Sequence, residues 1–491
     1  MPEAAKVNTP CGGYQGNSQL WKLIDNILGG TEVMRDNCRD WLPQEPKETL
    51  KSYRIRVSRS FLFNAVKDTM EKVVSKPFSR PVTLTENVPQ KLGGIADNCD
   101  LAGRDLTQFF RDVFKEALKR GLTHVLTDMP SIPDNARPRN LAEERDMRLR
   151  PVFVHIKPED LIAWKTRTAT NGELITEEIR FREVRTEPVG RYGEAVVEYI
   201  RVYTPTRWEL HRKHPDSKEF VKTEEGPVSY PGPGVPIRTL YFNRTSPYQA
   251  DPPLTELAWT NLAHFQSDSD QRNILRFTRF GILFAAGFSP AEIEKGIVIG
   301  PNKLVASANE KASLKYVESR DAASNAGVVD IKHLEERLVT LGLQPFVSKS
   351  GGQTATAKSI DEAKVHSNVQ AWARAVEAII GECYEDAARW VGVDLPDNFS
   401  ADVNNDFGIS ARAGEDVKNL IAVRAAGDIT RETYLKELRR RDLLSEAVDI
   451  EVELENVLAE GPPAGTITDP GPAPGDDDDD DDNPDDDNPD E

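Results

Sequence analysis

Residues 352–359 form the sequence GQTATAKS, which differs by one residue from the phosphate-binding loop pattern G-x-x-x-x-G-K-S. A predicted helix follows it, as it does in such loops. Ala357, however, replaces the glycine that lets backbone amides curl round a phosphate. A nucleotide-binding domain of this kind also needs later parallel strands, whereas the chain after residue 359 is predicted to be helical. The pattern therefore favours a basic loop before a helix, with a nucleotide site as the alternative.

Two further pairs of side chains could bind metal or transfer protons. His211 and His214 lie three residues apart in a charged stretch, but a metal site needs additional rigid ligands, so surface histidines at a strand end are favoured. Asp268 and Asp270 are two residues apart, which puts them on different faces of a predicted helix and favours solvated side chains. Hydrolase, zinc-protease, dinucleotide and calcium-loop patterns are absent. The sequence therefore predicts no catalytic residue, no metal and no cofactor.

Clusters of basic residues indicate a function more clearly than these His and Asp pairs do. Arg272, Arg276 and Arg279 are spaced by three or four residues, so they share one face of a predicted helix. Lys349 and Lys358 flank a Gly/Ser/Thr-rich segment without acidic residues. Either set could contact phosphate or pair with acidic side chains of a neighbouring chain.

The overall charge argues against a chain-wide nucleic-acid surface. The 491 residues include 62 Lys and Arg and 81 Asp and Glu, for a formal net charge of −19. Residues 461–491 hold thirteen of the acidic residues and no base, which leaves 68 acidic and 62 basic residues, a net −6, in residues 1–460. Hydrophobic residues make up 38% of the chain and charged residues 29%, which predicts extensive polar or inter-subunit surface.

Cysteine usage and hydropathy indicate the cellular compartment in which the protein is expected. The four cysteines are scattered without a C-x-x-C pair, which fits a reducing environment. The N-terminus lacks a secretory pattern, and the most apolar stretch, residues 280–288, is too short to cross a bilayer. The sequence therefore predicts a protein that is made inside the cell and does not enter a membrane.

The first half of the chain is predicted to be an α+β region. Helices are expected at 18–28, closed by Gly29-Gly30, at about 61–74, and at about 105–120, closed by Gly121. From residue 177 onward apolar and charged residues alternate, as in half-buried antiparallel strands. Strands are expected in the segments THVLTDMP, PVFVHIKP, EEIRFREVR, EAVVEYIRVYTP, RWELHRK and IRTLYF.

The second half is predicted to be mainly helical. One helix spans 254–280, and its middle, 266–273, has no apolar side chain, so we expect it to face water or a polar interface on all sides. A strand-containing excursion follows, then a helix for which Asp330 is the expected N-cap. A long helix begins at Ser359, and two or three more lie between 412 and 459. The Asp-rich end should be disordered.

The order of these segments resembles the portal proteins of tailed bacteriophages, specifically a subfamily often described only as phage portal or uncharacterised phage proteins. The resemblance covers most of residues 50–450, and its specificity comes from order and spacing, since no single motif is decisive. The segments that carry it are DLTQFFRDVFKEALKRGLTHVLTDMP, PVFVHIKPEDLIAWKTR, PPLTELAWTNLAHFQSDSD, TATAKSIDEAKVHSNVQAWARAVEAIIGECYEDAARWVGV and GEDVKNLIAVRAAGDITRETYLKELRRRDLLSEAVD.

This resemblance implies an α+β portal fold with wing, helical stem, clip and α-helical crown, assembled into a ring, commonly of twelve subunits. The clip sequence itself finds no convincing match. The implied parts are the N-terminal wing 1–253, first stem helix 254–280, clip 281–325, second stem helix 326–346, tunnel loop 347–358, wing helix 359–395, helical crown 396–460 and disordered acidic tail 461–491.

The same resemblance implies two sets of functional residues. The first is a tunnel loop close to DNA, comprising Ser348, Lys349, Ser350, Gln353, Thr354 and Lys358. The second lines or backs the channel on the stem helices, comprising Gln266, Asp268, Asp270, Arg272, Arg276, Arg279, Lys332, Glu335 and Glu336.

The implied function is structural: a channel at one capsid vertex through which double-stranded DNA is packaged and ejected. The implied partners are further copies of the chain, DNA, the terminase large subunit, a head–tail adaptor, and the major capsid and scaffolding proteins. The implied location is the virion, after synthesis in the host cytoplasm. Two alternatives remain: a packaging-motor subunit that binds nucleotide through 352–359, and a monomeric adaptor or scaffolding protein.

Overall fold

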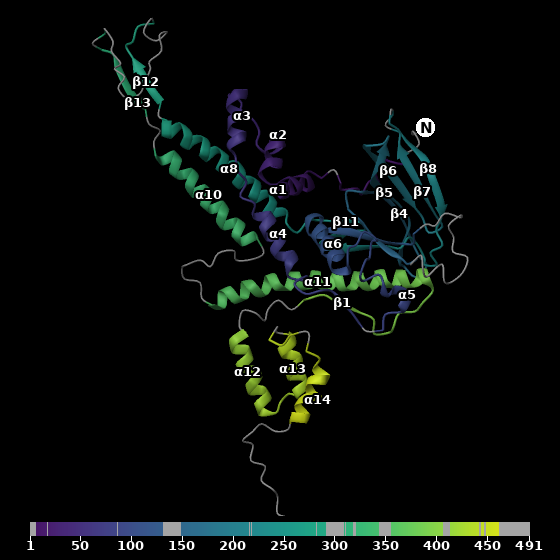
Figure 1. Ribbon diagram of the computed structural model, residues 1–491. Helices are drawn as coiled ribbons and strands as arrows, with labels where there is room; N and C mark the ends of the chain where they lie inside the picture. The colour runs from purple at the N-terminus through teal and green to yellow at the C-terminus, as the bar shows by residue number, and fades with distance from the viewer. Residues whose placement is uncertain are drawn as a thin grey trace, which may run out of the picture. The chain divides into compact units, whose positions relative to one another are not determined.

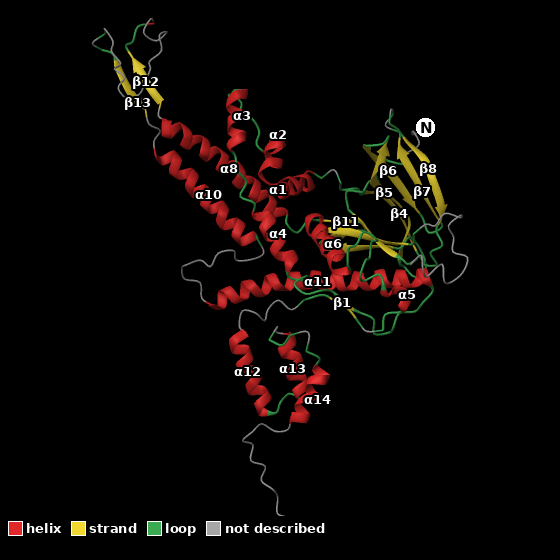
Figure 2. Ribbon diagram, in the orientation of Figure 1, coloured by secondary structure: helices red, strands yellow, loops and turns green. Residues whose placement is uncertain are grey.

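The computed structural model describes residues 6–16, 18–85, 87–130, 149–215, 217, 219–280, 282–290, 309, 311–317, 321–342, 355–405, 413–440, 443–445 and 448–460. The chain divides into two compact units, Met1–Phe407 and Gly408–Glu491. Figures 1 and 2 show their elements, and each unit is described by itself below.

The first unit begins with helices. A kink at Gly30, whose φ of 84° is left-handed, divides α1, so the predicted end of the first helix near Gly29-Gly30 is confirmed and a further helical segment follows it. The helix expected at 61–74 forms as α4, whereas α3 was not predicted. The bounds are α1 Gln19–Asp36, α2 Cys38–Trp41, α3 Leu50–Arg59, α4 Ala65–Ser75, α5 Gln90–Gly93 and α6 Leu106–Arg120.

The ends of α6 are fixed by its sequence, as predicted. The Asp105 carboxylate accepts a hydrogen bond from the Gln108 backbone N–H at 2.7 Å, which satisfies one of the free amides of the first turn. Gly121 ends the helix with a φ of 86°. A Cβ at Gly121 would lie 2.4 Å from the Asp251 carbonyl oxygen, so both conformation and space require glycine there.

Two antiparallel sheets confirm the predicted strands. The smaller sheet has the order β3-β2-β9, from Val152–Ile156, Leu122–Asp128 and Ile237–Tyr241. The larger has the order β4-β5-β6-β7-β8, and β4 and β8 were not among the predicted strands. Its strands are β4 Leu161–Thr168, β5 Leu174–Val189, β6 Gly193–Tyr203, β7 Arg207–Lys213 and β8 Phe220–Pro227.

Short strand pairs complete the first unit's β-structure. β10 (Arg244–Ser246) pairs with β11 (Gln249–Ala250), and β1 (Thr83–Leu84) pairs with β14 (Ala401–Asp402). All strand pairs in the described residues are antiparallel. The α+β class expected for this half of the chain is therefore confirmed.

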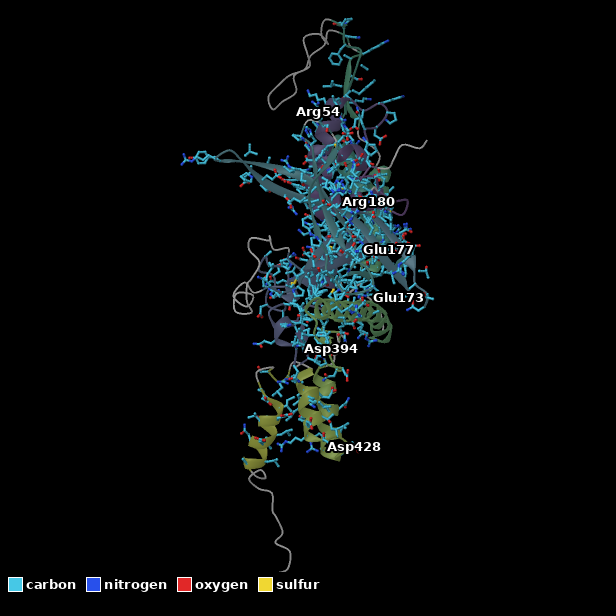
Figure 3. All side chains as sticks on the ribbon, turned by 90° about the vertical axis from the view of Figure 1, so that its right-hand side faces the viewer. Arg54, Glu173, Glu177, Arg180, Asp394 and Asp428 are labelled. Atoms are coloured by element: carbon cyan, nitrogen blue, oxygen red, sulfur yellow. The ribbon has the colours of Figure 1, made fainter. Side chains whose placement is uncertain are left out.

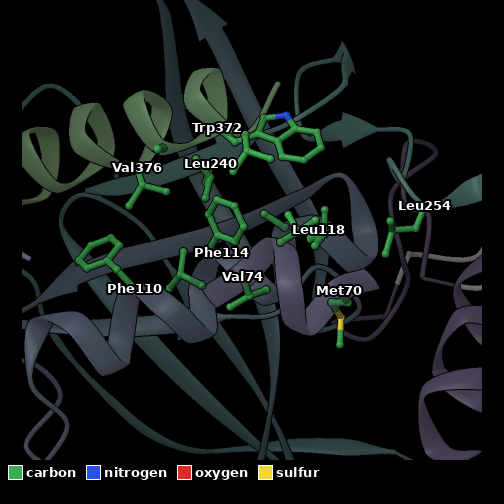
Figure 4. Packing of buried hydrophobic residues seen from close by; sticks show 14 of the residues in the cluster. Met70, Val74, Phe110, Phe114, Leu118, Leu240, Leu254, Trp372 and Val376 are labelled. Atoms are coloured by element: carbon green, nitrogen blue, oxygen red, sulfur yellow. The ribbon is translucent and has the colours of Figure 1, made fainter. Parts of the chain in front are cut away.

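The main hydrophobic core lies between α6, the smaller sheet and the long helix α11 (Ala355–Val391). Figure 4 shows Trp372 of α11 above Phe114 of α6, with Leu240 of β9 between the two helices. The Trp372 ring stacks on Phe242 with 4.8 Å between ring centroids. Because α11 begins 235 residues after α6 ends, this core joins the two halves of the sequence.

A helical pair with a strand hairpin extends this unit. α8 (Thr255–Phe280) packs along α10 (Asp321–Leu341), and β12 (Ile282–Ala286) pairs with β13 (Ser313–Val317) beyond their ends (Figure 1). The helix predicted at 254–280 is confirmed. The prediction that Asp330 caps the second helix is wrong, because α10 begins nine residues earlier, at Asp321.

The second unit contains three helices within its described residues: α12 Ala413–Ala426, α13 Arg431–Arg440 and α14 Ile450–Glu460. This confirms the prediction of two or three helices between 412 and 459. The acidic segment 461–491 lies outside the described residues. None of the described helices is both long and apolar enough to cross a membrane.

Candidate functional site

The α8–α10 pair is the part of the first unit that holds most of the residues predicted for a channel. Its base is anchored in the main core: Leu257, Leu262 and Phe265 of α8 are buried there, and Leu338 of α10 joins them. Toward the hairpin, apolar side chains become exposed. Ile274, Phe284, Val328 and Val329 are 36%, 54%, 39% and 51% exposed.

The prediction that the polar middle of α8 faces water or a polar interface on all sides holds only in part, because Asp270 and Arg272 are exposed but two of its residues are buried. Ser269 and Gln271 are only 2% and 5% exposed. A Cβ at Gly327 of α10 would lie 2.1 Å from the Gln271 side-chain oxygen, which shows how closely the two helices approach there. The polar residues are buried because α3 and α10 both pack against α8.

Hydrogen bonds connect this polar stretch to its neighbours. The Gln266 amide donates to the Trp41 carbonyl oxygen at 2.8 Å, and the Ser267 hydroxyl donates to the Asp330 carboxylate at 2.8 Å. Asp330 therefore lies inside α10 and links this helix to α8. This contact accounts for a polar residue that the sequence suggested as a helix cap.

Asp268 and Asp270 point in different directions, as their spacing predicted. Asp268 pairs with Arg272 one turn later, with 2.6 Å between the carboxylate oxygen and Nε. Asp270 lies 3.6 Å from the guanidinium of Arg56 on α3. They therefore do not form a carboxylate pair. No cluster of three or more His, Cys, Asp or Glu side chains suited to a metal occurs in the described residues.

Arg56 is a buried charge that sequence reasoning missed. Its Nε and Nη2 donate to the two Glu48 carboxylate oxygens at 3.0 and 2.8 Å, and Nη2 also donates to the Pro43 carbonyl oxygen at 2.8 Å. These hydrogen bonds from Arg56 hold the pKa of Glu48 below its usual value. The sequence of residues 48–56 could have suggested an ion pair between Glu48 and Arg56 only if the helix α3 had been predicted.

Arg272 and Arg276 share one side of α8, as predicted. Both line a hollow between α8 and α3, together with Arg59. The side chain of Arg279 lies outside the described residues. On α10, Lys332, Glu335 and Glu336 are exposed, and a Glu335 carboxylate oxygen lies 3.7 Å from His264 Nε2.

The predicted tunnel-loop set is mostly beyond what the structure describes. Ser348, Lys349, Ser350, Gln353 and Thr354 lie outside the described residues. Lys358 lies in α11, whose first residue is Ala355, and its side chain also lies outside the described residues.

The degenerate phosphate-binding loop receives no support from the backbone. Because α11 begins at Ala355, Thr356 and Ala357 are already helical, whereas a phosphate loop needs its central residues to curl outside the helix. The parallel strands of a nucleotide-binding domain are also missing among the described strand pairs, which are all antiparallel.

The histidine pair is placed as predicted, at the end of β7. His211 Nε2 lies 3.1 Å from the Glu209 carboxylate, and His214 follows the strand and is exposed. Neither belongs to a metal-binding cluster of the described residues.

Comparison with known proteins gives two findings. Residues 253–391 match a family described as a domain of unknown function, DUF4055, and this range begins just before α8 and ends with α11. No curated protein matches the chain.

Three solved structures contain similar chains, each 11% identical in sequence. One is described as the virion of a native gene transfer agent particle (TM-score 0.40, covering 75% of this chain and 88% of that chain). The others are the neck of an empty particle computed with C6 symmetry (0.41, 77% and 90%) and the neck of a native particle computed with C12 symmetry (0.38, 83% and 98%). At these TM-scores the similarity does not establish a shared fold.

The matched range 253–391 contains all nine predicted stem residues and the whole predicted tunnel loop. It excludes Arg56 and Arg59 of α3, which complete the charged surroundings of α8. The candidate site is thus built from α8 and α10 inside the matched range and from α3 outside it.

Proposed function

We propose that this chain is the subunit of a portal-type ring, a structural channel for double-stranded DNA at one vertex of a phage-like capsid. The observation that carries the proposal is the unit formed by α8, the β12–β13 hairpin and α10. One end of the helical pair is fixed in the core and the other carries the hairpin, which is the order of stem, clip and stem implied by the sequence resemblance.

The exposed apolar residues of this unit support an oligomer. Phe284 and Val329 are more than half exposed, and Ile274 and Val328 more than a third. Several exposed apolar side chains along one unit favour contacts with another surface. In a cyclic ring each subunit covers its neighbour, so every copy would bury the same side chains. We propose twelve subunits, as is common in the portal family.

The proposed partners follow from that role. The terminase large subunit and then a head–tail adaptor would bind at the hairpin end. The major capsid and scaffolding proteins would surround the ring in the virion. The chain itself would not hydrolyse nucleotide, since the packaging motor would be a separate protein.

Imaging of the purified full-length chain tests this proposal. Negative-stain electron microscopy should show rings with a central hole, and native mass spectrometry should give a mass twelve times that of one chain. Single small particles at all concentrations would favour a monomeric adaptor instead. A matched variant, Val329→Ser with Phe284→Ser, should weaken ring formation while leaving the helical content unchanged by circular dichroism.

A nucleotide-binding assay distinguishes the proposed structural ring from the alternative of a packaging-motor subunit. Purified protein should neither bind nor hydrolyse ATP in the presence of Mg²⁺. Saturable ATP binding that Lys358→Ala abolishes would support the motor and contradict a purely structural role.

A further inference from the structure

The hollow between α3 and α8 has the chemistry of an anion site. It is small: about 20 Å³ is open to the centre of a water-sized molecule, and the volume reaches about 260 Å³ only when space open to solvent is included. Four arginines line it: Arg56 and Arg59 from α3, and Arg272 and Arg276 from α8. Ser269 and Asn273 of α8 add a hydroxyl and an amide. Two helices therefore direct guanidinium groups and neutral donors toward one small space.

The positive charges of this hollow are only partly neutralised. Arg56, at its edge, is paired with Glu48 and Asp270. Arg272 is paired with Asp268, and its guanidinium lies 6.0 Å from the centroid of the Phe61 ring. Arg59 and Arg276 form no ion pair with any other residue that the structure describes. Two positive charges thus remain without a counter-charge in the described part of the chain.

Ser269 provides a second, independent observation. Its side chain is 2% exposed, and its hydroxyl has no hydrogen-bond partner among the described residues. A buried hydroxyl without a partner is destabilising, so such groups in folded proteins usually have a role. This hydroxyl lines the same hollow as the arginines, where it could donate to a bound anion.

We propose that this hollow binds a phosphate group, held by Arg59 and Arg276 and by the Ser269 hydroxyl. Guanidinium groups present several N–H donors in a plane and suit the oxygens of a tetrahedral oxyanion. The phosphate can come from free inorganic phosphate or from the backbone of DNA, and the chemistry of recognition is the same for both. The inference does not rest on ring formation, because every lining residue belongs to one chain.

Titration of the full-length protein with inorganic phosphate in a phosphate-free buffer tests the site. Isothermal titration calorimetry should show saturable binding to the unaltered chain. The double variant Arg59→Gln, Arg276→Gln should weaken binding at least tenfold, and Ser269→Ala should weaken it about three- to tenfold, since one hydrogen bond is lost. Arg54→Gln is the matched control, because Arg54 is exposed on the same helix but does not line the hollow (Figure 3). It should bind phosphate as the unaltered chain does.

A second arm uses a short DNA duplex to identify the source of the phosphate. Duplex binding that falls in the double variant but not in Arg54→Gln assigns the hollow to the DNA backbone, with strong salt dependence. Phosphate binding without this effect on duplex binding assigns it to the free anion. Absence of phosphate binding, or equal binding by all variants, would overturn the proposal. So would a double variant that loses only its oligomeric state, since the arginines would then serve a contact between copies.

Discussion

The Asp386 carboxylate on α11 is completely buried and accepts two hydrogen bonds from the Arg238 guanidinium on β9, at 2.6 and 2.7 Å. The Tyr230 hydroxyl donates to the same carboxylate at 2.7 Å, and Arg389 Nη1 lies 3.1 Å away. Burial alone would lower the pKa of Arg238, but its hydrogen bonds to Asp386 raise it. This cluster connects the C-terminal part of α11 to β9.

Asp386→Asn should destabilise the first unit by about 3 kcal/mol, because it removes the charge that compensates two arginines. The value lies at the low end of the range for buried pairs, since Arg238 is partly exposed and can turn toward water. Urea unfolding followed by tryptophan fluorescence measures the change in this unit alone, because all seven tryptophans precede residue 408.

The matched control is Glu385→Gln, on the same helix. Glu385 is 56% exposed and lies 3.6 Å from Arg389, so its loss should cost less than about 0.5 kcal/mol. Equal effects of the two substitutions would mean that Asp386 is not the residue that fastens α11.

Gly121→Ala should destabilise the first unit by more than about 2 kcal/mol. The left-handed φ of 86° disfavours any side chain, and the new Cβ would lie 2.4 Å from the Asp251 backbone oxygen. In contrast, Gly381→Ala should stabilise it by about 0.5–1 kcal/mol, because Gly381 lies inside α11 with open space around its Cβ position. The urea midpoints of the two variants should therefore move in opposite directions.

Local signals in the sequence were enough to predict the elements of the first unit. Asp105 and Gly121 mark the ends of α6, and alternating side chains mark β5 and β6, because capping and strand periodicity act over a few residues. α3 was missed since four of its ten residues are basic and they interrupt its apolar pattern. The burial of Arg56 on this helix depends on contacts with Glu48 and with α8, and these contacts form only in the tertiary fold.

The candidate site was predictable in part. The spacing of Arg272 and Arg276 correctly placed both on one side of α8. That Ser269 and Gln271 are buried could not be predicted, since a polar stretch becomes buried only when polar or small residues of other helices face it, as Gly327 does. The α8 hydrophobic pattern contains no information about which helices will pack beside it.

The stability of the first unit should fall as the pH is lowered from about 6.5 toward 4. Burial lowers the pKa of His124 to about 3 and that of His155 to about 4. Both remain neutral in the folded chain while the unfolded chain takes up protons below about pH 6.5. The free energy of unfolding therefore decreases across this window. Asp160 acts in the opposite direction, because burial raises its pKa to about 6.

His124→Gln isolates the histidine contribution. Glutamine can keep a hydrogen bond to Thr239, whose hydroxyl lies 2.9 Å from His124 Nδ1. Urea unfolding at pH 7, 6, 5 and 4 should show a shallower loss of stability in this variant than in the unaltered chain. Parallel curves for the two proteins would show that His124 does not govern the acid sensitivity.

Removal of residues 461–491 should leave the folded part of the chain unchanged. This segment consists largely of Asp, Pro and Gly, which cannot bury enough apolar surface to offset the entropy of ordering. Its deletion changes the formal net charge from −19 to −6, so the protein should elute earlier from an anion-exchange column. The melting temperature by differential scanning calorimetry should shift by less than about 2 °C. A fall of 5 °C or more would show that the acidic segment contacts the folded chain, which its composition does not predict.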